Sequence, residues 1–261
     1  MIGNISKLAD RITGSINRRI FRPSIIVEEV AGLTRLGSVY GGWTIKDAQD
    51  LVGCVAISCG LGEDASFDVE FAARYGADMV LVDPTPRSVT HYDQLVAHVG
   101  QSASTAYVKG GCQPVEAYDM SAIRPEQLRL EPKALWIDEE PVRFYKPANP
   151  AHVSHSVCFG AEEENADYIL VPTVTLAGLL ANLPQDRFAL LKMDIEGAET
   201  EILSSIAQWP VLPRQLLVEF DVLRSANAQS KAQVERIDAL LRSQGYACCH
   251  FDGERNYLYL R

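Results

Sequence analysis

The sequence has no hydrophobic run long enough to cross a membrane and few residues of the kinds that build metal or redox centres. No apolar stretch reaches the ~18 residues of a membrane span. The first 19 residues lack the apolar core and the A-x-A site of a secretory signal, so none is predicted. The six cysteines include no C-x-x-C pair of the kind that binds zinc. We therefore expect a cytoplasmic protein with reduced thiols.

Positive charge is also scarce. The chain has 24 Lys and Arg against 34 Asp and Glu, a formal net charge of −10. Since nucleic-acid binding relies on cationic contacts to phosphates, we expect no nucleic-acid partner. Local basic charge occurs only at the start, where residues 1–23 hold five basic groups and one acid.

That first stretch has a helical pattern. Apolar residues recur at positions 5, 8, 12, 16 and 20 with basic residues between them, so residues 1–35 are predicted to form an N-terminal helical segment. A basic amphipathic helix favours peripheral contact with an anionic membrane. Packing on the chain's own domain or on a second subunit explains the pattern as well, and a homo-oligomer stays open.

Short apolar runs alternate with helical patterns from residue 51 onward. The predicted strands are "CVAISC" (54–59), "DMVLVD" (78–83), "FALLKMDI" (188–195) and "QLLVEFDV" (215–222). Helical patterns follow the first three, which predicts a mainly parallel sheet with helices on both faces. A further short hairpin is predicted within "ALWIDEEPVRFYKP" (134–147).

The end of the chain predicts a helix and a hairpin. Ser230 and Gln233 have the spacing of a capping box, and Gly245 marks the end of that helix. "YACCHF" and "NYLYLR" then flank the turn-like "DGER", so the last strand should be antiparallel to its neighbour. A parallel sheet finished in this way is the architecture of class I methyltransferases, and dinucleotide-binding domains usually lack the hairpin.

A glycine turn follows the first of these strands. Gly60 and Gly62 are followed at once by Glu63 and Asp64. A G-x-G turn is typical of pyrophosphate sites, but two carboxylates at the helix start would repel a pyrophosphate. S-adenosylmethionine carries an ammonium and a sulfonium group and no phosphate, so it suits the turn better.

The next strand ends in Asp83, about twenty residues after the turn. A carboxylate there accepts hydrogen bonds from both ribose hydroxyls of an adenosine. This position does not separate NAD from S-adenosylmethionine. An NAD-type oxidoreductase on a Rossmann sheet therefore remains the alternative.

The motifs now assembled resemble the FkbM family of S-adenosylmethionine-dependent methyltransferases, over residues 36–221. They are "VYGGWTI", "ISCGLGEDASFD", "LVDPTPRS" and, most specifically, "VPTVTLAGLL…FALLKMDIEGAETEIL". The resemblance implies a single methyltransferase domain over residues 36–261, with a Rossmann-like, mainly parallel seven-stranded sheet and a C-terminal antiparallel hairpin strand. It also implies O-methylation of a small sugar-containing or polyketide-like acceptor.

The chain departs from the family pattern at two positions. Ser58 and Ala177 stand where the family often has Asp. A degenerate, non-catalytic domain that binds partners through its basic N-terminal helix therefore stays open as a third hypothesis. The expected cofactor-binding residues are Ser58, Gly60, Gly62, Asp64, Asp83 and Asp194.

Three residues are candidates for the chemistry. Asp194 ends a predicted parallel strand, and ligands bind outside the carboxyl ends of such strands. Glu196 lies two residues on and is either catalytic or a helix cap. His155 lies in a loop expected to cross the open face and is either a base or a surface histidine.

The remaining candidates concern the pocket walls and a metal. Tyr40 and Trp43 are expected to wall the substrate pocket, or alternatively to pack against the first strand. Asp194, Glu219 and Asp221 at two strand ends form an oxygen set suited to Mg²⁺. Strand-end acids without metal are the favoured interpretation.

Overall fold

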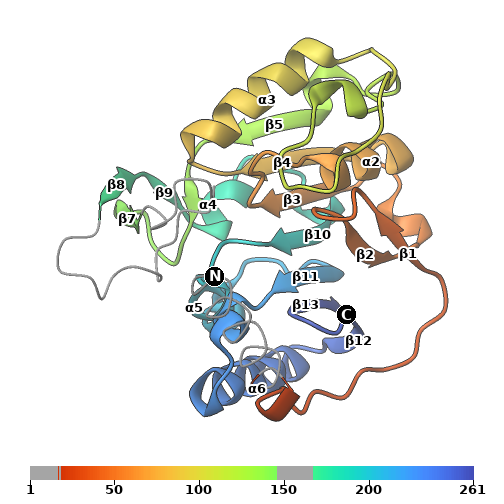
Figure 1. The fold of residues 1–261 in the computed structure, drawn as a ribbon. Helices are drawn as coiled ribbons and strands as arrows, with labels where there is room; N and C mark the ends of the chain where they lie inside the picture. The colour runs from red at the N-terminus through yellow and green to blue at the C-terminus, as the bar shows by residue number, and fades with distance from the viewer. Residues whose placement is uncertain (1–16, 18, 146–166) are drawn as a thin grey trace, which may run out of the picture.

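A computed structural model of the chain describes residues 17, 19–145 and 167–261. Its centre is a seven-stranded sheet flanked by helices on both faces (Figure 1). In spatial order the strands are β12 (Ala247–Phe251), β13 (Asn256–Leu260), β11 (Gln215–Glu219), β10 (Phe188–Met193), β3 (Val55–Cys59), β4 (Asp78–Val82) and β5 (Leu128–Glu131).

The sheet is mixed. β3 pairs in parallel with β4 and β10, β4 with β5, and β10 with β11. β13 is antiparallel to both β11 and β12, which confirms the predicted terminal hairpin. Every residue of β3 and β10 is buried, because helices cover both faces of the central strands. The molecule is thus an α/β fold built on a mixed seven-stranded sheet.

Among the residues that the structure describes, five labelled α-helices accompany the sheet. They are α2 (Ser66–Tyr75), α3 (Pro86–His98), α4 (Leu176–Leu180), α5 (Glu199–Ser204) and α6 (Ala228–Ser243). Short 3₁₀ helices lie between them: η1 (Gln49–Leu51), η2 (Val115–Ala117), η3 (Pro125–Gln127), η4 (Gln185–Arg187), η5 (Ile206–Gln208) and η6 (Asp221–Ser225). α2 ends at Gly76, whose positive φ of 58° suits glycine.

The start of α6 differs from the prediction. The N-cap is Asn227, whose Oδ1 accepts hydrogen bonds from the backbone N–H groups of Gln229 and Ser230. Ser230 is the reciprocal partner, since its Oγ accepts from the Asn227 N–H. The capping box therefore exists three residues earlier, because Asn is as good a cap as Ser and its partner here is a serine.

Three two-stranded sheets lie beside the main one. β1 (Leu33–Leu36) and β2 (Trp43–Lys46) are antiparallel, β6 (Ala134–Leu135) and β9 (Thr173–Val174) are parallel, and β7 (Val142–Tyr145) and β8 (Tyr168–Val171) are antiparallel. The predicted hairpin within residues 134–147 is therefore wrong. β6 and β7 each pair with a strand that lies beyond residue 166, and local pattern carries no information about such distant partners.

The expected boundary at residue 35 also needs correction. Residues 19 and 20 are helical, but residues 22–30 have no regular structure, and β1 crosses the boundary to pair with β2. The described segment before β1 lies against the end of the sheet, where the Glu28 N–H donates to the Cys248 carbonyl of β12. Of the described helices, none has the length and apolar character needed to cross a membrane.

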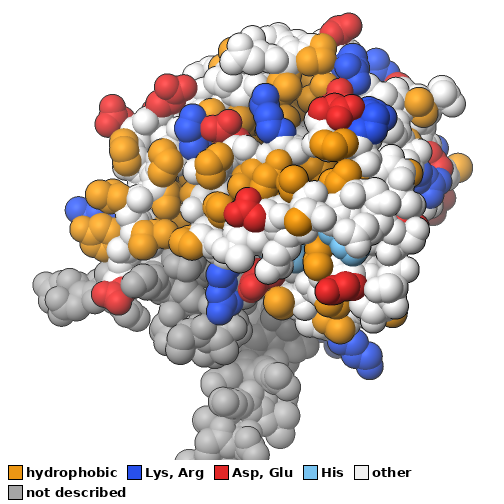
Figure 2. Space-filling view, turned by 90° about the horizontal axis from the view of Figure 1, so that it is seen from above, with side chains coloured by type: hydrophobic (Ala, Val, Ile, Leu, Met, Phe, Trp, Pro, Cys, Tyr) orange, Lys and Arg blue, Asp and Glu red, His pale blue; other side chains and the backbone are white. Residues whose placement is uncertain are grey.

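The core has one large hydrophobic cluster on each side of the sheet. One joins the sheet to α5 and α6, and the other joins it to α2, α3 and β2. On the face of the molecule that includes α3, acidic and basic side chains lie interspersed among hydrophobic ones (Figure 2).

Candidate functional site

A cavity of about 1260 Å³ lies at the carboxyl ends of the central strands. Residues at or just after the carboxyl ends of β3, β4, β10 and β11 line it, namely Gly60, Asp83, Asp194 and Glu219. Residues 39–44 and the β12–β13 hairpin supply further walls. This is the place where open α/β sheets bind ligands.

The glycine turn after β3 is built by a close approach of two strand ends. Gly60 has a φ of 87°, and a Cβ there would overlap the carbonyl oxygen of Asp194. The Gly60 N–H donates to the Val82 carbonyl at 3.0 Å, and the Asp194 N–H donates to the Cys59 carbonyl at 3.1 Å. Only glycine fits this position. Because glycine has no side chain, the turn leaves open space above the sheet.

Asp83 is fixed at the end of β4. Its Oδ2 accepts from the Gly62 N–H at 3.0 Å, and its Oδ1 accepts from the backbone N–H and the hydroxyl of Thr85 at 2.8 and 2.7 Å. The side chain is held in one position at the cavity wall, next to the glycine turn.

Asp64 joins the start of α2 to the segment that carries Tyr40 and Trp43. Its oxygens accept from the Ser38 hydroxyl at 2.7 Å, the Ser66 N–H at 3.0 Å and the Gln113 amide at 3.2 Å. Asp64 lines the cavity and touches Gly41 so closely that a Cβ there would lie 2.6 Å from the Asp64 Cγ.

The two aromatic candidates both line the cavity. Trp43 is buried in β2, while the Tyr40 side chain stands at the rim and is 66% exposed. Partial burial, and then the negative charges of Asp194 and Glu196, raise the pKa of the Tyr40 hydroxyl. The Tyr40 hydroxyl therefore faces the acidic end of the cavity.

Two predicted site residues do not appear at the cavity. Ser58 is buried inside β3 and is not among the lining residues. His155 lies outside the described residues.

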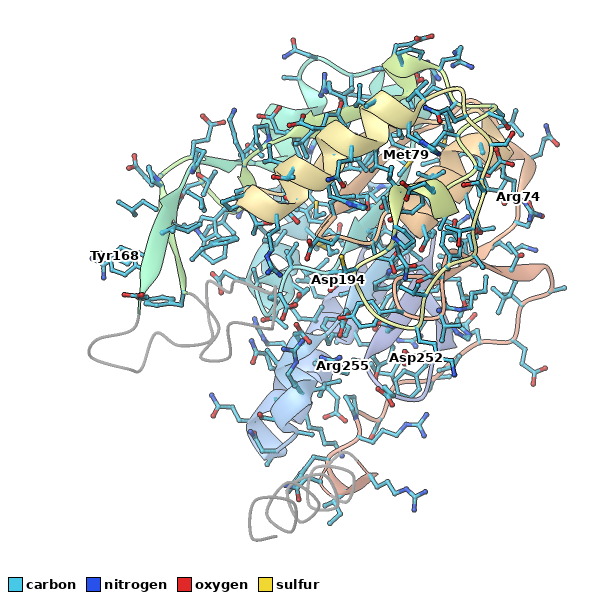
Figure 3. The ribbon with its side chains drawn as sticks, turned by 45° about the horizontal axis from the view of Figure 1, so that its top comes forward. Arg74, Met79, Tyr168, Asp194, Asp252 and Arg255 are labelled. Atoms are coloured by element: carbon cyan, nitrogen blue, oxygen red, sulfur yellow. The ribbon has the colours of Figure 1, made fainter. Side chains whose placement is uncertain are left out.

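Asp194 and Glu219 form the acidic end of the cavity, at the ends of the neighbouring strands β10 and β11. Figure 3 shows Asp194 near the middle of the molecule. Burial raises the pKa of the Glu219 carboxyl well above its usual range, and the charges of Asp194 and Asp221 raise it further. Arg255 opposes this rise, since its Nη2 lies 2.7 Å from Glu219 Oε1. Burial and the neighbouring acids therefore favour the protonated form of Glu219.

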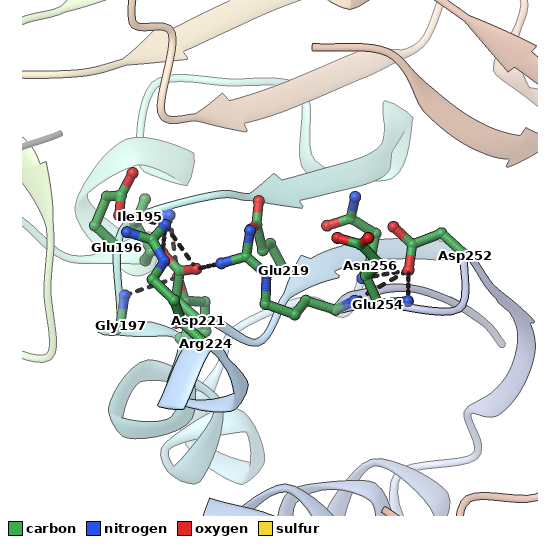
Figure 4. A network of polar contacts seen from close by, with 11 residues as sticks. Ile195, Glu196, Gly197, Glu219, Asp221, Arg224, Asp252, Glu254 and Asn256 are labelled. Atoms are coloured by element: carbon green, nitrogen blue, oxygen red, sulfur yellow. Dashed lines mark hydrogen bonds and ion pairs between the residues drawn. The ribbon is translucent and has the colours of Figure 1, made fainter. Parts of the chain in front are cut away.

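Two arginines neutralise the carboxylate beneath this pair. Asp221 is fully buried and accepts from Arg224 Nη2 at 3.0 and 3.1 Å, and it is also paired with Arg255 (Figure 4). The guanidinium groups stand where a cation would have to bind. Asp194, Glu219 and Asp221 therefore do not fit a Mg²⁺ ion. In the described part of the chain no group of three or more His, Cys, Asp or Glu side chains is arranged to hold a metal.

The turn after β10 holds the other two acids of "DIEGAE". Glu196 has a φ of 55°, which is strained for a residue with a side chain, and its Oε2 lies 3.0 Å from Arg224 Nη2. Glu199 Oε1 accepts from the Ile195 and Gly197 N–H groups, each at 3.1 Å. Burial, then the charge of Asp221, raises the pKa of Glu199 to about 8. Glu199 therefore stabilises the turn. Glu196 stays open as either a catalytic residue or a helix cap.

Sequence reasoning missed the basic side chains of the site. Arg224 lies in η6, after β11, and Arg255 lies just before β13. No local sequence pattern links either arginine to Asp221. Lys192 did leave a signal, because it is a charged residue inside an otherwise apolar strand and lies two positions before Asp194. Residues two apart in a strand share a face, so Lys192 and Asp194 lie on the same side of β10.

The structure is an α/β fold in which a glycine turn and fixed carboxylates surround a cavity. The profile of the Methyltransferase FkbM domain matches residues 59–248. The chain belongs to the FkbM methyltransferase family, as the sequence motifs predict.

The other comparisons add little. Among solved structures, the antibiotic-resistance methyltransferase Kmr is 13% identical, with 87% of this chain and 99% of that chain covered and a TM-score of 0.30. A likeness of this size carries no argument. No curated protein matches the chain.

Proposed function

We propose that this protein is a cytoplasmic S-adenosylmethionine-dependent O-methyltransferase that modifies a hydroxyl group of a small sugar-containing or polyketide-like acceptor. The observation that carries the proposal is the placement of Asp194. This carboxylate shares the cavity with the glycine turn and Asp83, and a protonated Glu219 lies beside it.

The sheet supports the finer fold assignment. The order β5-β4-β3-β10-β11-β13-β12, with β13 antiparallel, agrees with the Rossmann-like class I methyltransferase fold expected from the sequence. It places the glycine turn after β3, which lies beside β10 where the chain order reverses and ligand sites of such sheets form.

The residues around the turn fit the proposed donor. Asp83 would accept from the ribose hydroxyls, and Asp64 would face the ammonium group. The donor supplies a methyl group on a positively charged sulfur, which is reactive without further activation. A negative charge on Asp194 favours a sulfonium nearby and disfavours a pyrophosphate, so the NAD-type alternative loses support.

The chain's own part in the reaction is orientation and removal of one proton. Asp194 is placed to accept a hydrogen bond from the acceptor hydroxyl and then its proton. Glu219 keeps its proton because of its burial and because of the charges next to it, so it does not compete for the acceptor. Tyr40 and Trp43 offer apolar faces on which a sugar ring or a nucleobase packs.

The size of the cavity agrees with two ligands. Its volume of about 1260 Å³ exceeds the ~300–1,000 Å³ of ordinary small-molecule sites. Ser58 and Ala177 do not line it, so the absence of Asp at these positions removes no contact from the cavity wall. This observation weighs against the degenerate, non-catalytic hypothesis.

Ligand-induced thermal stabilisation tests the proposal. S-adenosylhomocysteine should raise the melting temperature, because a ligand that binds only the native state stabilises it. Asp83→Ala should lose most of that rise, whereas Asp93→Ala, on α3 and away from the cavity, should keep it. A rise with NADH and none with S-adenosylhomocysteine would overturn the proposed function.

A further inference from the structure

Lys192 is a buried cation in the wall of the cavity. It projects from the middle of β10 and is only 4% exposed, yet it is one of the residues that line the cavity. Lysine is rarely buried to this degree unless a negative charge pairs with it, because removing an ammonium group from water is costly.

The described contacts of this ammonium do not neutralise it. Lys192 Nζ donates to the Gly60 carbonyl at 2.9 Å and lies 5.6 Å from the centre of the Trp43 ring. Among the described residues, no carboxylate lies within ion-pair distance of it. An ammonium has three N–H donors, and the Gly60 carbonyl uses one.

The buried acid Asp68 does not take this place. Asp68 on α2 is fully buried, and Lys192 acts on it through space without an ion pair. Burial raises the pKa of the Asp68 carboxyl, so its charged form is disfavoured. Asp68 also lies outside the cavity lining.

Residues 41–43 place Lys192 and Asp64 along the same wall. Gly41 contacts Asp64, and the ring of Trp43 contacts Lys192. Both side chains also line the cavity. An α-amino acid carries one ammonium and one carboxylate, so it offers a partner of opposite charge to each of the two side chains.

We propose that Lys192 binds the carboxylate of the amino-acid end of the methyl donor, while Asp64 faces the ammonium of the same end. The inference rests on the proposed function and adds a residue to the donor site. The donor's carboxylate supplies the negative charge that the buried ammonium lacks. Binding of the amino-acid end is thereby coupled to the glycine turn, because the same ammonium holds the Gly60 carbonyl.

Calorimetric titration of Lys192→Met with three ligands tests the assignment. S-adenosylhomocysteine has the carboxylate. Decarboxylated S-adenosylmethionine is the methyl donor without its carboxylate, and 5′-methylthioadenosine lacks the whole amino-acid end. The variant should bind S-adenosylhomocysteine about 10- to 100-fold more weakly, the range expected for a lost charged hydrogen bond. Its affinity for the other two ligands should stay within about threefold of wild type.

The controls separate a folding defect from a lost contact. Binding of 5′-methylthioadenosine shows that the adenosine site of the variant is intact. Lys192→Arg should recover part of the affinity for S-adenosylhomocysteine, and Lys231→Met on α6 should behave as wild type.

Two results would overturn the inference while leaving the proposed function standing. One is an unchanged affinity of Lys192→Met for S-adenosylhomocysteine. The other is an equal loss for all three ligands, which would mean that Lys192 acts only by holding the Gly60 carbonyl. Failure of the wild type to bind any of the three ligands would instead overturn both proposals.

Discussion

Asp194 and Glu219 are both carboxylic acids at strand ends, but their surroundings differ. Glu219 is buried among other acids, and the resulting rise in its pKa keeps it protonated near neutral pH. Asp194 lines the same cavity. Because the surroundings of Glu219 disfavour its charged form, Asp194 is the candidate base of the two.

Asp194→Asn should therefore affect the reaction more than the fold. The amide keeps the shape of the side chain but does not accept a proton, so methyl transfer should fall by roughly 10²-fold or more. Thermal unfolding and binding of S-adenosylhomocysteine should stay close to wild type. Wild-type turnover should not change with EDTA, since the acids present do not fit a metal. A variant with nearly normal turnover would make Asp194 a structural residue.

Glu199 predicts a pH effect on stability. Its pKa is about 8 in the folded protein against 4.5 for the ordinary side chain. A raised pKa stabilises the fold below pH 4.5, and that contribution is lost as pH rises toward 8 and beyond. Glu199→Gln retains the acceptor for the Ile195 and Gly197 N–H groups and does not titrate.

Urea unfolding at pH 5, 7 and 9 measures this contribution. Wild type should lose unfolding free energy relative to Glu199→Gln across this range, by on the order of a few kcal/mol. Glu201→Gln, an exposed residue on the same helix, should follow wild type. Parallel curves for wild type and Glu199→Gln would show that this carboxyl is ionised in the fold.

At the scale of elements, the sequence predicted what depends on local pattern. β3, β4, β10 and β11 are continuous apolar runs because helices cover both faces of the sheet, and the glycine turn and Asp83 follow from their places at strand ends. The pairs β6–β9 and β7–β8 were missed, because their partners lie more than 20 residues apart in the chain. The start of α6 was missed because two polar residues three positions apart, Asn227 and Ser230, compete as caps.

The two glycines of the turn should respond differently to a side chain. At Gly60 a Cβ would overlap the Asp194 carbonyl, so Gly60→Ala must separate the ends of β3 and β10. We expect a loss of about 3 kcal/mol or more in unfolding free energy, and loss of ligand binding. At Gly62 nothing lies within 4 Å of a Cβ, so Gly62→Ala should pay only the strain of its φ of 55°, about 1–2 kcal/mol.

Urea unfolding of the two variants gives the comparison directly. Equal losses would mean that the close approach of the two strand ends does not limit the residue at position 60.

At the scale of the whole molecule, the segment before β1 ties the ends of the chain together. Figure 1 shows it running from the region of α6 past β12 to β1. The Ser24 N–H donates to Glu235 Oε1 at 2.7 Å, and Arg242 Nη2 donates to the Ile26 carbonyl at 2.8 Å. β12 is the edge strand of the sheet, and this segment covers part of that edge.

Two truncations separate this structural role from the basic helix expected before it. Deleting residues 1–21 leaves these contacts in place, so stability and binding of S-adenosylhomocysteine should stay close to wild type. Deleting residues 1–31 removes them and uncovers the edge of β12. The free energy of unfolding should then fall by about 2–4 kcal/mol, the sum of a few lost hydrogen bonds and ion pairs, and the protein should associate more readily at high concentration.

The full-length chain and the protein without residues 1–21 also test the proposed membrane contact. If the basic helix binds an anionic surface, the full-length chain should sediment with vesicles that contain anionic lipid and not with neutral ones, and deletion of residues 1–21 should abolish this binding. The binding should weaken as salt is raised, because exposed charges are screened within about 10 Å at 0.1 M. A full-length chain that ignores anionic vesicles, and whose oligomeric state changes on the deletion, would assign the helix to contact between subunits instead.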